Sequence, residues 1–506
     1  MRLRLNALLC AALAAAIYAI HRFTKEETER KSSENDGAVL HDVSYDAPND
    51  ATTAVPSTDD PPLAEPSPGV VKMTVTSADK RLSDGATLSW NAPDSRSARD
   101  LIVLTPATKF QEIVGFGAAF TDAACYMFNQ LTQEARDKLF NELFHPSRTA
   151  LNMCRTCIGS SDYATHAYSY ADGEPDPEFT RFSIDHDRQY IIPMLQQAMK
   201  QNPDMFLFSS PWSPPGWMKS NGSMLGGNVQ RRWFAAYARY LLKFVQAYEA
   251  AGVPVQAITV QNEVDTDQDG NMPACLWPQE YEVDFVRQHL GPLFAQEAPR
   301  TQIWMIDHNF NLWGRALATL QEWGVKQYAK AIAWHGYVGD PVAATTVHNA
   351  HPEVDAYWTE GGPGFDASDY GTDWARWGHS FNTYLRNWCR GLTGWNLALD
   401  EKGQPNIGPF NCGGLVTINS TTQEISYSGQ YWALAQFSRF IRRGARRIDS
   451  QAELKDITHV AFENPNGDKV VVVTNSGPAR EVSLQLGSWR ADVQLDPDSV
   501  TTLTWQ

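Results

Sequence analysis

From residue 113 to about residue 444, short apolar runs alternate with longer stretches whose apolar residues recur every three or four positions. The short runs predict strands and the longer stretches predict amphipathic helices. The eight expected strands are Ile113–Gly117, Ala150–Ile158, Met205–Ser210, Ala257–Gln261, Gln302–Asp307, Ala331–His335, Val354–Thr359 and Gly391–Leu397. Eight repeats of strand and helix predict a (β/α)8 TIM barrel, with a doubly wound open sheet as the alternative.

The pattern changes after the last expected helix, which covers Gly429–Arg442. Short runs with alternating apolar residues follow, and they predict the strands Ile457–Phe462, Lys469–Thr474, Glu481–Leu486 and Ser499–Trp505. Val70–Thr76 and Thr87–Trp90 are also typical of strands. We therefore expect one β-sandwich side domain built from residues 70–110 and 445–506, beside a catalytic barrel of residues 111–444.

The N-terminal residues have a composition unlike the rest of the chain. Residues 1–22 combine early arginines with a short apolar run, which is typical of a signal peptide or an uncleaved signal anchor. Residues 23–69 are rich in Asp, Pro, Ser and Thr, so they predict a disordered acidic stalk. Both interpretations send the protein into the secretory pathway, where it would be secreted, periplasmic or anchored at a membrane surface.

Charge and cysteine content exclude several classes of function. The formal net charge of −16 argues against a nucleic-acid partner. Cys154 and Cys157 have the spacing of a metal or redox pair, but they fall in an expected core strand and no second pair accompanies them. Buried free thiols are the favoured interpretation.

Two other motifs resemble binding loops incompletely. The segment 115–120 has phenylalanine where a dinucleotide-binding loop needs its third glycine. The acidic loop 265–270 begins like a calcium loop, but position twelve is Leu276 and the bidentate acid is missing. We therefore expect no cofactor and no metal.

The strongest chemical signal is a pair of strands that each end on a glutamate. Glu263 follows the expected strand Ala257–Gln261, and Glu360 follows Val354–Thr359. A TIM barrel gathers its catalytic groups at the C-terminal ends of its strands. Most glycosidases use two carboxylate side chains, one on each side of the scissile glycosidic bond, as their catalytic groups. The pair therefore predicts a retaining glycosidase, in which Glu360 is the nucleophile.

Glu263 is then the expected acid/base, with a pKa raised by burial and by the second carboxylate. Its neighbour Asn262 can donate to the sugar 2-hydroxyl. Three further candidates stand near strand ends. Asp122 can hold two sugar hydroxyls or cap a helix, Trp212 can form a rigid wall for a sugar ring, and His335 can orient Glu360 or contact the substrate. Trp395, at the end of the eighth expected strand, would close the ring of aromatic side chains.

These motifs together resemble the family 30 glycoside hydrolases, in the branch of lysosomal acid glucosylceramidase and its microbial relatives. The resemblance runs from about residue 70 to the C-terminus. It rests on five motifs: Gly115 to Asp122, Ser210 to Pro215, Gln261-Asn262-Glu263, Thr359-Glu360, and Gly394 to Asp400. It implies a barrel with a sandwich made from both chain ends.

The resemblance also implies roles for individual residues. Glu263 would be the acid/base and Glu360 the nucleophile. Asp122, Trp212, Asn262 and Trp395 would bind the glycone, while Arg155 and His335 would support the carboxylates. The chain departs from the family pattern at Val264, where the family usually has proline, and in the stretch around Asn411.

The expected activity is hydrolysis of β-glucosides such as glucosylceramide, and the lipid substrate would bring the enzyme to a membrane surface. An endo-β-1,6-glucanase or a β-xylosidase of the same family is the enzymatic alternative. A catalytically silent carbohydrate-binding scaffold is the alternative from a different class.

Overall fold

The computed structural model describes residues 68–92 and 100–506. The expected signal segment, and the expected stalk up to residue 67, lie outside the described residues. Within the described residues, no helix is both long and apolar enough to span a membrane.

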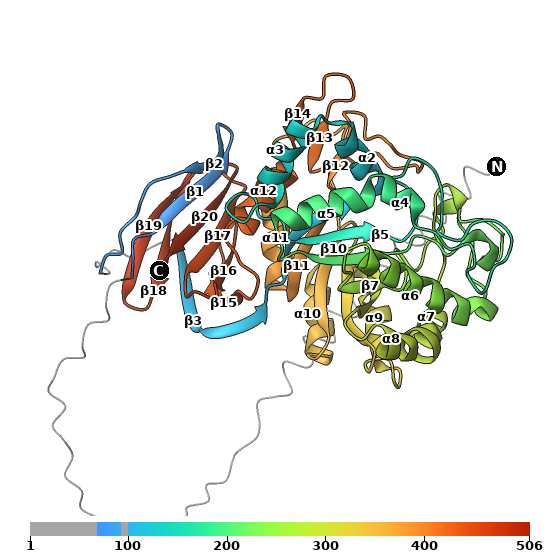
Figure 1. The fold of residues 1–506 in the computed structure, drawn as a ribbon. Helices are drawn as coiled ribbons and strands as arrows, with labels where there is room; N and C mark the ends of the chain where they lie inside the picture. The colour runs from blue at the N-terminus through green and yellow to red at the C-terminus, as the bar shows by residue number, and fades with distance from the viewer. Residues whose placement is uncertain (1–67, 93–99) are drawn as a thin grey trace, which may run out of the picture. The chain divides into compact units, whose positions relative to one another are not determined.

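Eight parallel strands close into a barrel, as the alternating pattern predicts (Figure 1). The open-sheet alternative is therefore wrong. The strands are β4 (Gly115–Phe120), β5 (Met153–Cys157), β6 (Phe206–Ser210), β7 (Ala257–Thr259), β8 (Gln302–Asn309), β9 (Ala329–His335), β10 (Asp355–Glu360) and β11 (Cys389–Asn396). β7 ends two residues earlier than expected, so Glu263 belongs to the loop that follows it.

Helices follow the barrel strands and bury their apolar faces against them (Figure 1). They are α2 (Asp122–Gln130), α3 (Gln133–Phe144), α4 (Asp185–Gln189), α5 (Ile191–Gln201), α6 (Phe234–Ala250), α7 (Gln279–Phe285), α8 (Gly291–Glu297), α9 (Trp313–Gln321), α10 (Val342–Ala350), α11 (Trp374–Arg386) and α12 (Gly429–Ser438). A small sheet of β12 (Ala398–Leu399), β13 (Val416–Ile418) and β14 (Ile425–Tyr427) precedes α12.

The inside of the barrel has an apolar layer beneath a polar one. Met153, Phe208, Trp304 and Tyr357 belong to one buried cluster, and the rings of Trp304 and Tyr357 stack with centroids 4.2 Å apart. Inward-facing residues alternate along each strand. The next inward positions toward the C-terminal ends, such as Arg155 after Met153, are therefore the ones that can meet at the mouth of the barrel.

The side domain is one hydrogen-bonded sheet of nine strands, in the order β19-β18-β3-β15-β16-β17-β20-β1-β2. Its strands are β1 (Lys72–Ser77), β2 (Lys80–Asp84), β3 (Leu101–Glu112), β15 (Arg446–Gln451), β16 (Ile457–Glu463), β17 (Lys469–Asn475), β18 (Arg480–Leu486), β19 (Trp489–Leu495) and β20 (Ser499–Trp505). Residues from distant strands of this sheet share one apolar core. The sheet therefore folds over itself as a β-sandwich, built from both chain ends as expected.

The sequence prediction of this sheet was incomplete. Thr87–Trp90 forms only a single bridge, between Leu88 and Val71, and is not a strand. Sequence patterns did not identify β2, β3, β15 and β19. β3 is the longest strand of the sheet, and Pro106 together with its polar C-terminal half hides its alternation.

The outer face of the sandwich packs on the barrel through α11 and α12. Along β17, Val471 and Val473 lie in the sandwich core, whereas Val470 and Val472 belong to the barrel's core cluster. This two-residue alternation lets one strand serve both cores. Barrel and sandwich are therefore joined by continuous apolar packing.

Candidate functional site

Asp307 is the centre of the polar layer at the barrel mouth. It is completely buried and pairs with the Arg155 guanidinium at 2.8 Å and with His335 Nε2 at 3.1 Å. The hydroxyl groups of Ser210, Thr259 and Thr359 also donate to its carboxylate, at distances from 2.7 to 2.9 Å. Burial alone would raise the pKa of Asp307, but Arg155 and His335 hold it far below its usual range.

A distortion of β8 points Asp307 into the barrel. The pairing of β8 with β9 shifts register between Ile306 and His308, and Ile306 and Asp307 have φ values of 72° and 45°. Such conformations are strained for residues other than glycine, above all for β-branched isoleucine. Trp304 faces the inside of the barrel, so regular two-residue alternation would turn Asp307 outward. The bulge turns its carboxylate inward instead.

Glu360 is fixed from two sides. The buried Arg155 side chain donates to its Oε2 atom, and the Tyr337 hydroxyl donates to Oε1 at 3.2 Å. His335 Nε2 lies 3.7 Å from Oε2. One face of the carboxylate is thus held by a cation while the residue lines a cavity.

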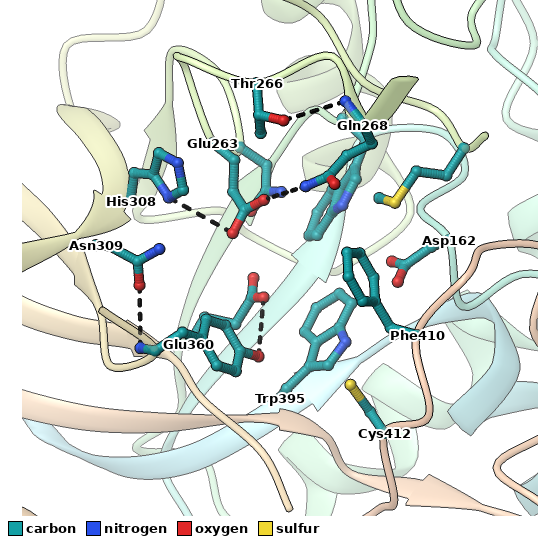
Figure 2. Close-up of a pocket in the computed structure, with 14 residues that line it drawn as sticks. Asp162, Glu263, Thr266, Gln268, His308, Asn309, Glu360, Trp395, Phe410 and Cys412 are labelled. Atoms are coloured by element: carbon teal, nitrogen blue, oxygen red, sulfur yellow. Dashed lines mark hydrogen bonds and ion pairs between the residues drawn. The ribbon is translucent and has the colours of Figure 1, made fainter. Parts of the chain in front are cut away.

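Glu263 has a positive φ of 55°, and its backbone N–H donates to the Asp307 carbonyl at 2.9 Å. Its carboxylate contacts His335 Nδ1 at 3.3 Å, Gln268 Nε2 at 2.9 Å and His308 Nδ1 at 3.5 Å. Figure 2 shows the carboxylates of Glu263 and Glu360 directed toward the same space. The two glutamates therefore share one cavity and one histidine.

The pKa of Glu263 differs from the expectation. Burial raises it, but the hydrogen bond from His335, the charges of His308 and His335 and the Gln268 amide together lower it below its ordinary value. Nearby carboxylates in turn change the pKa of His335. Its burial favours the neutral ring, yet Glu360, Asp307 and Glu263 raise the pKa of His335 to about 9. The expectation of a raised Glu263 pKa was wrong because it left out the histidines.

A cavity of about 400 Å³ opens over these groups (Figure 2). Its lining residues are Asp162, Trp212, Asn262, Glu263, Thr266, Gln268, Met272, His308, Asn309, Tyr337, Glu360, Trp395, Phe410 and Cys412. The cavity combines two carboxylates, aromatic rings and amide groups, which suits a polyhydroxylated ligand with apolar ring faces.

Three of the predicted binding residues line this cavity. The Trp212 and Trp395 rings stack with centroids 5.1 Å apart, and the Arg155 guanidinium lies over both. Asn262 Oδ1 accepts a 2.7 Å hydrogen bond from Arg155, which fixes the orientation of its amide. Arg155 thus holds Glu360, Asn262 and Asp307 together.

Asp122 does not line the cavity. Its oxygens accept hydrogen bonds from the Thr165 amide at 2.6 Å and the Tyr190 hydroxyl at 2.7 Å, and they also contact His186 at 2.7 Å. The helix cap is the neighbouring Thr121. The predicted contact of Asp122 with a sugar stays a prediction.

Asp162, Asp307 and Tyr337 are among the residues of the site that sequence analysis missed. Each stands at or just beyond the C-terminal end of a barrel strand, which is the signal that could have identified them. Asp162 lines the cavity, and burial together with the charge of Glu360 raises its pKa well above the ordinary value. Asn411 is not part of the lining, although Phe410 and Cys412 on either side of it are.

The six cysteines of the described residues are unpaired, and all but Cys412 are buried. Cys154 and Cys157 accordingly form neither a disulfide nor part of a metal-ligating group within residues 68–92 and 100–506. Over the same residues, one group has three potential metal ligands close together: Glu263, His308 and His335.

Comparison with known proteins agrees with the fold. The chain is 33% identical to an endo-1,6-beta-D-glucanase of Neurospora crassa over 391 residues, covering 73% of this chain and 80% of the relative. It is 30% identical to the lysosomal acid glucosylceramidase of Mus musculus over 396 residues, covering 74% and 77%. The solved structure of the endo-beta1,6-glucanase BT3312 superposes with a TM-score of 0.79 at 27% identity, covering 86% of this chain and 99% of that one.

Residues 113–441 match the Glycosyl hydrolase family 30 TIM-barrel domain, and residues 444–503 match the Glycosyl hydrolase family 30 beta sandwich domain. Both domains of this family are therefore present, with the barrel before the sandwich. The two glutamates of the barrel face a single cavity. The chain belongs to glycosyl hydrolase family 30 and is a glycosidase.

Proposed function

We propose that the protein is a retaining β-glucosidase in which Glu360 is the nucleophile and Glu263 the acid/base. The observation that supports this most strongly is the shared cavity, in which both carboxylates are directed at one space and contact the same histidine. A double displacement needs two carboxylates of unlike surroundings. Glu360 is held by Arg155, whereas Glu263 is held by His335 and Gln268.

In the first step, a Glu360 oxygen bonds to the anomeric carbon, the glycosidic C–O bond breaks, and Glu263 gives its proton to the leaving oxygen. In the second step, water gives a proton to Glu263. The oxygen of that water bonds to the anomeric carbon as the bond between this carbon and Glu360 breaks. The protonated His335 ring, 3.3 Å from Glu263, lowers the pKa of that carboxyl and so favours return of the negative charge once Glu263 has given its proton away.

We assign the glycone to the side of the cavity lined by Asp162, Trp212, Asn262 and Trp395. Asp162 has its carboxyl at the cavity wall and can accept from two sugar hydroxyls. Trp395 offers an aromatic surface beside it, braced by Trp212 and by an edge contact with Tyr163 at 5.9 Å. Asp122 is the competing candidate for the hydroxyl contact.

For the leaving group, we propose a second glucose unit in β-1,6 linkage. The groups next to Glu263 are Thr266, Gln268, His308 and Asn309, and all of them line the cavity. Polar side chains on the acid's side suit a sugar leaving group with hydroxyls to satisfy. The similarity to endo-1,6-beta-glucanases supports the same substrate.

Glucosylceramide is the second candidate. The loop after β9 exposes apolar surface close to the nucleophile, since Tyr337 is 44% and Val338 is 54% exposed. Such a surface can contact the alkyl chains of a lipid aglycone at a membrane. The identity to the mouse glucosylceramidase supports this alternative as well.

Purified enzyme assayed with an aryl β-glucoside, an aryl β-xyloside, a β-1,6-glucan and dispersed glucosylceramide tests the proposal. We expect turnover of the aryl β-glucoside, initial release of the β-anomer by NMR, and higher kcat/KM on the glucan than on the glycolipid. A higher kcat/KM on glucosylceramide than on the glucan would contradict the proposed aglycone. A higher kcat/KM on the xyloside than on the glucoside would contradict the proposed glycone. Release of the α-anomer would contradict retention, and the absence of all turnover would support a silent binding scaffold.

A further inference from the structure

A second histidine faces the oxygen of Glu263 that His335 contacts. His308 Nδ1 lies 3.5 Å from Glu263 Oε1, and His335 Nδ1 lies 3.3 Å from the same atom. One ligand atom from each of the three residues falls within 4.8 Å of the others. In the proposed mechanism His308 faces the leaving-group side of the cavity, and it takes no part in the proton transfer.

The spacing agrees with tetrahedral zinc. Zinc binds histidine nitrogen at about 2.0–2.1 Å and carboxylate oxygen at about 2.0–2.2 Å, so the edges of such a tetrahedron are about 3.3–3.6 Å long. The distances from Glu263 Oε1 to the two histidine nitrogens, 3.3 and 3.5 Å, fall within that range, and all three ligand atoms lie within 4.8 Å of one another. Two histidines and a glutamate are also a known zinc ligand set that leaves a fourth position open.

The outer nitrogens of both imidazoles are held by carboxylates. His308 Nε2 contacts Asp265 Oδ1 at 2.6 Å, and His335 Nε2 contacts Asp307 Oδ1 at 3.1 Å. Carboxylate–histidine–zinc arrangements use this contact to orient the ring and to strengthen the inner nitrogen as a ligand. Here it turns both Nδ1 atoms toward Glu263.

His308 Nδ1 is buried and makes no hydrogen bond within the described part of the chain, while the residue as a whole is 8% exposed. A buried ring nitrogen normally has a partner. His308 and Glu263 both line the cavity, so this nitrogen lies behind the cavity wall. Figure 2 shows the His308 ring beside the Glu263 carboxylate, with their contact drawn.

We propose that Glu263, His308 and His335 form an inhibitory binding site for Zn²⁺, in which the ion displaces the Nδ1 proton of His335 to solvent and the fourth position opens to the cavity. The nearby acids Asp265, Asp307 and Glu360 add favourable charge. The bound ion holds the Glu263 carboxylate and keeps it from carrying a proton to the leaving group, so hydrolysis stops while the metal is present. Magnesium and calcium prefer all-oxygen ligand sets and do not bind here.

The binding half of this proposal does not depend on the proposed function. We would treat the full-length protein with EDTA, remove the chelator, and measure Zn²⁺ binding by isothermal titration calorimetry together with the thermal unfolding midpoint. The wild type should bind one equivalent and unfold at a higher temperature with Zn²⁺, because a ligand of the folded state stabilises it. Mg²⁺ should do neither.

Variants locate the site. His308→Asn should weaken zinc binding at least tenfold, and Asp265→Asn, which releases the outer nitrogen, should weaken it about 10–100-fold. His379→Asn changes an exposed histidine on α11 and should leave binding unchanged. Zinc binding that is absent, or equally strong in His308→Asn, would overturn the site.

The inhibition half uses the rate of aryl β-glucoside hydrolysis, with each variant compared with its own zinc-free rate. Zn²⁺ should inhibit the wild type reversibly, EDTA should restore the rate, and His308→Asn should need at least ten times more zinc for the same inhibition. One equivalent bound without inhibition would overturn the inhibitory role. If no glycoside is hydrolysed, the proposed function fails while calorimetry still decides the site.

Discussion

At the scale of single residues, Glu263 shows that neighbours outweigh burial. The imidazoles of His308 and His335 and the amide of Gln268 lie beside its carboxylate. Together they lower the pKa of Glu263, which burial alone would raise. The sequence shows Glu263 at a strand end, but it does not show that His308 and His335 converge on it from β8 and β9. Residue identity was therefore predictable, whereas its protonation behaviour was not.

Replacing Glu263 by alanine separates acid catalysis from the rest of the mechanism. We expect a loss of about 10²–10⁴-fold in kcat/KM for substrates with poor leaving groups, because general acid catalysis contributes that much. An activated aryl β-glucoside, whose leaving group needs little protonation, should lose less in its glycosylation step. Steady-state kinetics on both substrates measure the difference. Glu297→Ala, an exposed glutamate at the end of α8, is the control. Equal losses on both substrates would rule out Glu263 as the acid.

His335 makes the stability of the protein depend on pH. Its pKa rises from 6.5 to about 9 on folding. Protonation of the ring therefore stabilises the folded state fully below about pH 6.5, and this contribution is lost as the pH rises through about 9. The full effect is on the order of 3 kcal/mol.

Urea unfolding of wild type and His335→Gln at pH values between 6 and 9.5 measures this contribution. The free energy of unfolding should fall more steeply with rising pH in the wild type than in the variant. His379→Gln, which changes an exposed histidine, should retain the wild-type slope. Parallel curves for wild type and His335→Gln would contradict the role of His335 as a buried cation.

At the scale of elements, strand ends were predictable but bulges were not. Eight barrel strands follow from apolar runs, and Trp212, Asn262 and Trp395 follow from their positions at or after the strand ends. Asp307 closes an expected strand, yet only the register shift at Ile306 turns its side chain inward. β3 escaped prediction because Pro106 and its polar C-terminal half hide its alternation, and its partners, β15 and β18, come more than 300 residues later in the chain.

We expect the loop after Glu263 to influence the pH range of the enzyme through Gln268. The Gln268 amide donates to Glu263 Oε2 at 2.9 Å and so helps to lower the pKa of Glu263. Gln268→Leu removes this donor at similar volume. The pKa of Glu263 should rise, and the alkaline limb of the kcat/KM profile, where the acid loses its proton, should move to higher pH. Gln288→Leu, on the segment after α7, is the control. An alkaline limb that stays in place, or moves to lower pH, would contradict this role.

At the scale of the whole molecule, barrel and sandwich are coupled at Gly378 of α11. A Cβ atom there would lie 2.6 Å from Thr474 Oγ1 and 2.7 Å from Val500 Cγ2 of the sandwich. Gly378→Val should therefore lower the free energy of unfolding by about 1–3 kcal/mol through overpacking, with a lower thermal midpoint. Gly371→Ala lies in open space and should leave the midpoint near that of the wild type. Equal midpoints for the two variants would show that this contact does not couple the domains.

The N-terminal segment supports a separate proposal at this scale. Residues 1–22 have the composition of a signal segment, and we propose that the chain enters the secretory pathway. Expression of the full chain, followed by N-terminal sequencing of the secreted and the membrane fractions, separates a cleaved signal from an anchor. Full-length protein retained in the cytosol would contradict both.

The central claim is that Glu360 forms a covalent bond to the sugar. The most direct measurement is peptide mass spectrometry after treatment with an activated 2-deoxy-2-fluoro-β-glucoside, which slows the release of the glycosyl-enzyme. The mechanism predicts one fluoroglucosyl group on the peptide that contains Glu360, and its absence from Glu360→Gln. A label on another residue would contradict the assignment of Glu360 as the nucleophile. Turnover of the aryl β-glucoside with no label on the protein would do so as well.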